Sequence, residues 1–129
     1  MKRIILSLGV LIILTQNLSA RSKLDAMIAN ETDITKKQTY MCNKEQEHPR
    51  SANVNICLKA KYLIQKNYPY EKNALYATIL NIGLIYDEQG DDLKAFKYYM
   101  QAAKFGGRIG IIAQKNLSIM CKENPWACK

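Results

Sequence analysis

Helix-breaking residues divide this chain into segments of similar length. The breaks are His48-Pro49, Tyr68-Pro69-Tyr70, Gly90 and Gly106-Gly107. Between them, apolar residues recur every three or four positions, which is the spacing that lines one face of a helix. Few segments alternate with period two, so strands are not favoured. The pattern predicts an all-α fold, a short stack of antiparallel helical hairpins with about five helices.

The breaks also set the expected bounds of these helices. We expect them at 39–46, from a cap at Ser51 to Asn67, from Glu71 to Gly90, from a cap at Asp91 to Phe105, and at 108–122. Proline pushes the preceding residue out of the α region, and glycine provides the left-handed conformation that ends many helices. Residues 21–37 are mostly polar and are predicted to form an N-terminal arm with at most two helical turns. The helical domain is expected at 38–129.

Residues 1–20 have the order of a secretory signal peptide. Lys2 and Arg3 precede a largely apolar segment, Ile4 to Leu14, and Leu18-Ser19-Ala20 ends in a small residue. The apolar segment has 11 residues, whereas a membrane-spanning helix needs about 20. We therefore expect cleavage after Ala20, no stable membrane span, and a periplasmic or secreted protein.

The expected mature chain is basic. Without Lys2 and Arg3, 17 of the 19 Lys and Arg remain against 11 Asp and Glu, a net charge of +6. A positive charge favours polyanionic or acidic partners. The lysines are spread along the chain, and no basic cluster is interleaved with aromatic residues, as binding of single-stranded nucleic acid requires. We expect no nucleic-acid partner; the expected partner is another protein, and an acidic surface on it would be favourable.

Four cysteines remain after cleavage: Cys42, Cys57, Cys121 and Cys128. An even number in a small exported protein indicates two disulfides, and four cysteines allow three pairings. A zinc site is not favoured, because no C-x2-C pair is present and the single histidine, His48, precedes a proline in an expected turn. No metal or cofactor is expected.

Two short sequences recur at the same offset. Leu58-Lys59-Ala60 returns as Leu93-Lys94-Ala95, and Asn81-Ile82 as Asn116-Leu117, in both cases 35 residues later. The central unit places a set of small and aromatic residues in the order L-G-x2-Y…G…A-x3-F…A: Gly83, Tyr86, Gly90, Ala95, Tyr99 and Ala102. This unit resembles the tetratricopeptide repeat and its slightly longer Sel-one-like relative.

The resemblance covers about residues 74–121. The chain departs from the repeat at Ile79, where tryptophan is favoured, and at Gly107, where proline is favoured. A generic helical bundle is the alternative. In either arrangement, Cys42 and Cys57 lie nearly symmetrically about the turn at 49–50, while the other two cysteines enclose six C-terminal residues. We predict the pairs Cys42–Cys57 and Cys121–Cys128, each stabilising the fold by about 2–3 kcal/mol.

No catalytic constellation stands out in the sequence. His48 has no nucleophile motif near it, and the glycine-containing segment 106–110 lacks the lysine and the preceding strand of a phosphate loop. Four carboxylates cluster at the end of one expected helix and the start of the next, where the second pair favours the helix dipole: Asp87, Glu88, Asp91 and Asp92. We expect the protein not to be an enzyme.

The resemblance implies a concave binding surface formed by the first helices of successive hairpins. Its residues here would be Leu80, Asn81, Leu84, Asp87, Lys115, Asn116 and Ile119. Asparagines on such a face can hydrogen-bond the backbone of an extended peptide, although Leu80 and Leu84 could instead be core residues.

The expected function is that of an exported protein–protein interaction module, a scaffold or adaptor in a bacterial envelope complex. One alternative is a periplasmic inhibitor or immunity protein for a secreted toxin or a cell-wall hydrolase. Another is a weak enzyme or a binder of cell-wall ligands, for which the sequence shows no site.

Overall fold

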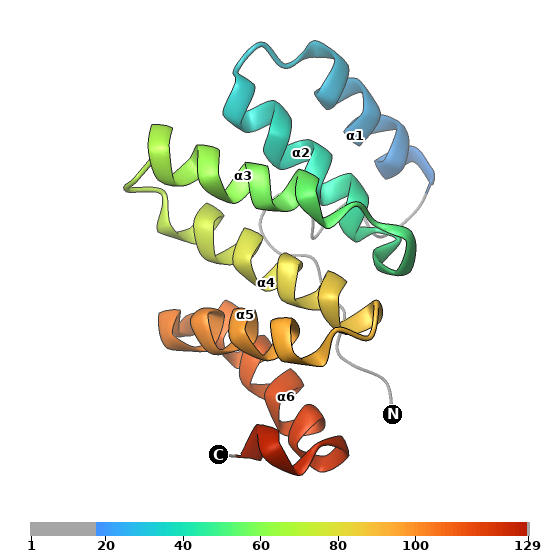
Figure 1. Cartoon of the computed structure of the whole chain (residues 1–129). Helices are drawn as coiled ribbons and strands as arrows, with labels where there is room; N and C mark the ends of the chain where they lie inside the picture. Colours follow the sequence, from blue (N-terminus) through green and yellow to red (C-terminus); the bar gives the residue numbers. More distant parts are fainter. Residues whose placement is uncertain (1–17, 129) are drawn as a thin grey trace.

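The computed structural model describes residues 18–128, and helices account for nearly all of them (Figure 1). Six α-helices follow one another: α1 (Leu18–Asn30), α2 (Ile34–Gln46), α3 (Val54–Asn67), α4 (Lys72–Glu88), α5 (Asp92–Phe105) and α6 (Gly107–Glu123). Two short 3-10 helices, η2 (Pro49–Ser51) and η3 (Pro125–Cys128), complete the described range, which contains no strand. The all-α prediction is confirmed. Most of the predicted signal peptide lies outside the described residues, and the position after Ala20 falls within α1.

The helices form a stack in which each packs mainly on its neighbours in sequence (Figure 1). The helices α2 and α3 form one antiparallel hairpin, and α4 and α5 form the next. Alternate helices also touch, α2 with α4 and α4 with α6. The three helices α2, α4 and α6 therefore line one side of the stack.

Turn chemistry fixes where the helices begin and end. Asp33 caps α2 and Asp91 caps α5, each accepting a hydrogen bond from a backbone N–H three residues later. Gly90 has a φ of +83°, which confirms the left-handed stop predicted after α4. The predicted cap of α3 was wrong: Asn53 caps this helix, while Ser51 lies in η2 and its hydroxyl donates to the carbonyl of His48.

The segment predicted as an N-terminal arm is mostly helical. In α1, Leu24 is fully buried against Ile28 and Tyr40, and Asp25 forms a 2.8 Å salt bridge with Lys44 of α2. The next helix, α2, begins at Ile34 instead of residue 39. The expected boundary at residue 38 therefore falls inside α2. A few apolar side chains on one face of α1 suffice to dock it on α2.

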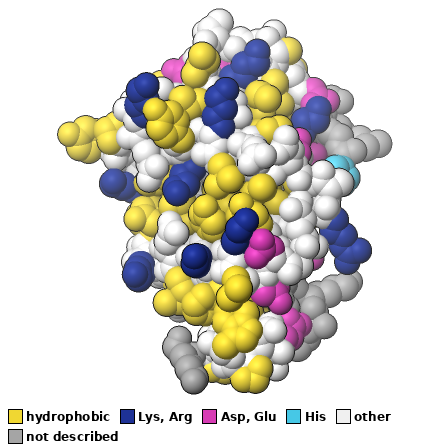
Figure 2. Space-filling model, viewed as in Figure 1, with side chains coloured by type: hydrophobic (Ala, Val, Ile, Leu, Met, Phe, Trp, Pro, Cys, Tyr) yellow, Lys and Arg dark blue, Asp and Glu magenta, His cyan; other side chains and the backbone are white. Residues whose placement is uncertain are grey.

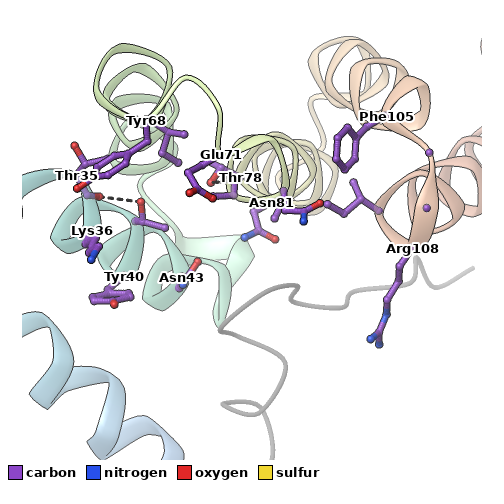
Figure 3. A pocket seen from close by; sticks show the side chains of 18 residues that line it. Thr35, Lys36, Tyr40, Asn43, Tyr68, Glu71, Thr78, Asn81, Phe105 and Arg108 are labelled. Carbon is purple, nitrogen blue, oxygen red and sulfur yellow. Dashed lines mark hydrogen bonds between the residues drawn. The ribbon is translucent and has the colours of Figure 1, made fainter.

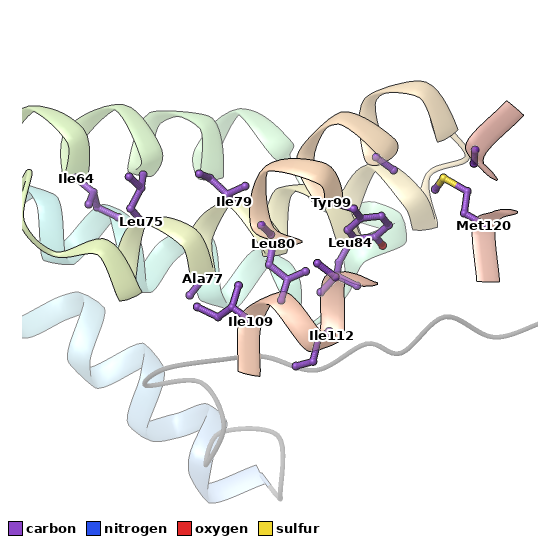
Figure 4. Packing of buried hydrophobic residues seen from close by; sticks show 14 residues of the cluster. Ile64, Leu75, Ala77, Ile79, Leu80, Leu84, Tyr99, Ile109, Ile112 and Met120 are labelled. Atoms are coloured by element: carbon purple, nitrogen blue, oxygen red, sulfur yellow. The ribbon is translucent and has the colours of Figure 1, made fainter. Parts of the chain in front are cut away.

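The largest core cluster lies where α4, α5 and α6 meet (Figure 4). Gly83 allows α4 and α5 to approach closely, since a Cβ atom there would lie 2.9 Å from the Tyr99 ring. Ala95 and Tyr99 are both fully buried. Gly83 is therefore a close-contact residue between α4 and α5.

Both predicted disulfides are present. Cys42–Cys57 joins α2 to α3 with a Cα–Cα distance of 4.6 Å, and Cys121–Cys128 joins α6 to η3 with a distance of 4.7 Å. The first pair is fully buried, whereas Cys128 is exposed. Such bonds persist in oxidising compartments, so they are consistent with an exported protein.

Candidate partner-binding groove

A groove of about 740 Å³ runs across the side of the stack formed by α2, α4 and the start of α6. Figure 3 shows the α2 side chains along one edge, Glu71, Thr78 and Asn81 in the middle, and Phe105 and Arg108 along the other edge. The lining residues come from segments as far apart in sequence as Thr35 and Ile109. The groove therefore exists only in the folded stack.

The α2 edge of the groove is held by side chains from α3. Asn67 donates a 2.9 Å hydrogen bond to the hydroxyl of Thr35, which is almost fully buried. Tyr68, which also lines the groove, donates its hydroxyl to the carboxylate of Asp33. These contacts fix the start of α2 against the end of α3.

The contact between Asp33 and Tyr68 changes the acidity of both groups. The hydrogen bond donated by Tyr68, together with the backbone N–H of Lys36, stabilises the carboxylate and lowers the pKa of Asp33 below its ordinary value of 3.8. The same hydrogen bond raises the pKa of Tyr68 above its ordinary value of 10.0, because the phenolate would lose it and face a negative charge. At neutral pH the pair is a carboxylate and a neutral phenol.

The floor of the groove belongs to α4. Ala74 and Ala77 contribute only small side chains to the floor. The Thr78 hydroxyl donates a 2.9 Å hydrogen bond to the carbonyl of Ala74. Asn81 is 1% exposed, and its side-chain oxygen Oδ1 is buried without a hydrogen-bond partner within residues 18–128. Leaving a buried polar atom unsatisfied costs about 1–3 kcal/mol, so Asn81 is the least satisfied part of this surface.

The far edge is the beginning of α6. Gly106 and Gly107 both have positive φ, +82° and +60°, and the N-cap residue Gly106 has no side chain that could accept hydrogen bonds from the first turn. A helix start carries partial positive charge and several N–H groups without partners in the helix. Arg108 extends from this turn and is exposed (Figure 3). This edge of the groove is therefore electropositive.

Cations elsewhere on the surface are dispersed. On the face drawn in Figure 2, Lys and Arg side chains are spread over the surface, and some lie beside Asp or Glu side chains. This agrees with the scattered lysines of the sequence. In the groove, the charged side chains are Lys36 and Arg108 at the edges and Glu71 between them.

Most residues of the predicted binding surface lie in the interior. Leu80 and Leu84 are fully buried and pack with Ile109 and Ile112 of α6, so their predicted place on a partner-binding surface was wrong (Figure 4). The physical reason is that α6 packs directly on this part of α4, and side chains between the two helices become core.

The polar members of the predicted surface divide in the same way. Asp87 is buried and accepts a 2.7 Å hydrogen bond from the Tyr99 hydroxyl, and Asn116 is fully buried, so neither lies on an open surface. Lys115 is exposed and Ile119 partly exposed, but neither lines the groove. Of the predicted residues only Asn81 lines the groove, and its side chain is 1% exposed.

The sequence-based interpretation missed the α2 side of the groove. The sequence does not predict Thr35, Thr39 and Tyr68 as binding residues, because the resemblance begins near residue 74 and residues 21–37 are predicted to form an arm. Asp33, a good N-cap residue followed by a helix-length segment, was the available indication that α2 starts early.

No group of three or more His, Cys, Asp or Glu within residues 18–128 is arranged to hold a metal ion. All four cysteines are engaged in disulfides. Among the helices of the described range, none combines the length and the apolar character needed to cross a membrane.

Comparison with known proteins found no match to any family model, to any curated protein or to any solved structure. The resemblance to tetratricopeptide and Sel-one-like repeats therefore stays a prediction that rests on the motif residues alone.

Proposed function

We propose that the protein is an exported interaction module of the tetratricopeptide-like type, which holds a segment of a partner protein in the groove between α2, α4 and α6. In this role it serves as a scaffold or adaptor in an envelope complex. The observation that carries the proposal is the groove itself, with a buried, unpaired Asn81 on its floor.

The dimensions of the groove support a bound segment of chain. Its volume of about 740 Å³ lies within the range of about 300–1,000 Å³ that is usual for ligand sites. Its walls combine apolar side chains with hydroxyl, amide and charged groups at the edges, the composition that gives a site both affinity and orientation. The Cys42–Cys57 disulfide and the two helical hairpins hold these walls in place.

The test fills the groove without disturbing the core. Asn73 is exposed on α4 and lines the groove, so Asn73→Trp should obstruct it. Asn55→Trp, at an exposed position of α3 that does not line the groove, is the matched control. Partners are captured from the native envelope with each variant and quantified by mass spectrometry.

We expect Asn73→Trp to lose the bound protein and Asn55→Trp to retain it. If both variants retain the same partner, binding does not use the groove and the proposal fails. The stoichiometry separates the two expected roles. Several co-purifying envelope proteins indicate a scaffold, whereas a single toxin or hydrolase in a tight one-to-one complex indicates an inhibitor.

A further inference from the structure

We infer that the segment held in the groove is an extended acidic peptide. One of its carboxylate side chains lies at the first turn of α6 beside Arg108, and one of its backbone N–H groups donates a hydrogen bond to Oδ1 of Asn81. This inference rests on the proposed function and adds the chemistry of the ligand.

The first observation is the unpaired oxygen of Asn81. Oδ1 is a hydrogen-bond acceptor buried on the groove floor, and it has no partner among the described residues. A ligand that donates a hydrogen bond there removes a desolvation cost that the folded protein already carries. An extended peptide supplies such donors at regular intervals along its backbone.

The second observation is the open helix start at the other edge. A Cβ atom added at Gly106 or Gly107 would meet nothing within 4 Å, so the space beside this backbone is free. The first-turn N–H groups have no capping side chain on Gly106, and anions are stabilised at such a position. Arg108, in the same turn, provides a guanidinium that pairs with carboxylates.

The balance of charge points in the same direction. The groove lining contains two cationic side chains and a helix start but a single carboxylate, Glu71, among the described residues. The expected mature chain carries a net charge of +6. A peptide is favoured over a nucleic acid because Lys36 and Arg108 are the only cationic side chains that line the groove within the described residues, too few to follow a phosphate backbone.

The experiment uses an array of acetylated and amidated peptides, so that only side chains carry charge. Each peptide rich in Asp and Glu is paired with a copy in which these residues are Asn and Gln. The protein, with both disulfides intact, is applied at low salt, and the peptides that are retained are measured again by fluorescence anisotropy with Arg108→Gln and Asn81→Leu. Arg50→Gln is the matched control, because Arg50 is exposed in η2 and does not line the groove.

We expect the acidic peptides to bind at least about tenfold more tightly than their amide copies, since one hydrogen bond to a charged group suffices for a difference of this size. Arg108→Gln should remove most of this preference, and Arg50→Gln should leave it unchanged. Asn81→Leu should weaken acidic and amide peptides by the same factor, because it removes a contact with the backbone.

Equal binding of the acidic and amide copies, an equal effect of Arg108→Gln and Arg50→Gln, or no retained acidic peptide would each overturn the inference. A single-stranded oligonucleotide is measured in the same anisotropy assay, and tighter binding of it than of every acidic peptide would also overturn the inference. The proposed function has a separate readout: if Asn73→Trp still removes the natural partner while acidic peptides show no preference, the groove is the binding site but its ligand is not acidic.

Discussion

At the scale of single residues, Gly83 decides how closely α4 and α5 pack. A Cβ at this position would lie 2.9 Å from one carbon of the Tyr99 ring and 3.3 Å from the Cβ of Tyr98, and Tyr99 is fully buried. Tyr99 cannot simply move aside, because its hydroxyl donates to buried Asp87. A side chain at residue 83 must therefore separate the two helices.

We expect Gly83→Leu to lower the free energy of unfolding by about 1–3 kcal/mol, the usual cost of overpacking a core. Thermal denaturation followed by circular dichroism measures the change. Gln101→Leu, at an exposed position of α5, serves as the control. An unchanged melting temperature for Gly83→Leu would contradict the close contact between the two helices.

Asn81 and Asn116 form a contrasting pair of buried asparagines. Both are nearly or fully buried, but Asn81 leaves Oδ1 without a partner, whereas Asn116 interacts with other groups. We expect Asn81→Leu to stabilise the fold by about 1 kcal/mol, because an apolar side chain of similar size removes the unsatisfied oxygen. Asn116→Leu should destabilise it by about 1–3 kcal/mol. Urea denaturation compares them, and a loss of stability in Asn81→Leu would show that this oxygen is satisfied.

At the scale of helices, the sequence predicted the elements bounded by clear breaks and missed those bounded by weak ones. Proline at 49 and 69 and glycine at 90 and 106 separate the five helices from α2 to α6 in the structure, as expected. The helix α1 has no such signals and little amphipathic pattern, and it is helical because Leu24 packs on α2. Contacts between distant segments are not visible in local spacing.

The binding surface was harder to predict for the same reason. The periodicity of α4 shows which of its residues are apolar, but it does not show that α6 covers Leu80 and Leu84 while leaving the region around Asn81 as the floor of a groove. The Cys42–Cys57 disulfide was predictable because two cysteines placed symmetrically about the turn between two helices come together when the helices pack antiparallel.

The hydrogen bond between Asp33, which precedes α2, and Tyr68, which follows α3, gives a pH-dependent prediction. The lowered pKa of Asp33 means that its contact with Tyr68 stabilises the fold above pH 3.8, and that this contribution disappears as the pH falls through the lowered pKa. We therefore expect Tyr68→Phe to reduce stability at neutral pH and to match the wild type in strong acid. Tyr70→Phe is the control, since Tyr70 is 93% exposed. Chemical denaturation at several pH values makes the comparison, and a difference that persists in strong acid would contradict it.

At the scale of the whole molecule, the two disulfides lie toward opposite ends of the described stack. In a linear stack, the terminal elements contact a neighbour on one side only, so they are the first to separate. Cys42–Cys57 ties the α2–α3 hairpin together, and Cys121–Cys128 ties η3 to α6. The short η3 also brings Trp126 edge-on to Phe96 of α5, with ring centroids 5.4 Å apart.

This arrangement predicts that the two bonds are reduced in a fixed order with different consequences. Cys128 is exposed, whereas Cys42 and Cys57 are fully buried, so a mild reductant should open Cys121–Cys128 first. Loss of that bond should release only η3, leaving the groove and its ligand affinity intact, because no groove residue lies beyond Ile109.

Removing Cys42–Cys57 by paired substitution to alanine should instead lower the free energy of unfolding by about 3 kcal/mol, as expected for a separation of 15 residues. It should also increase hydrogen exchange along α2, the edge of the groove. Alkylation with mass spectrometry gives the order of reduction, and hydrogen exchange gives the regions that open. If the buried pair is reduced first, or if release of η3 increases exchange in α2, the stack responds as one cooperative unit and its ends do not open independently.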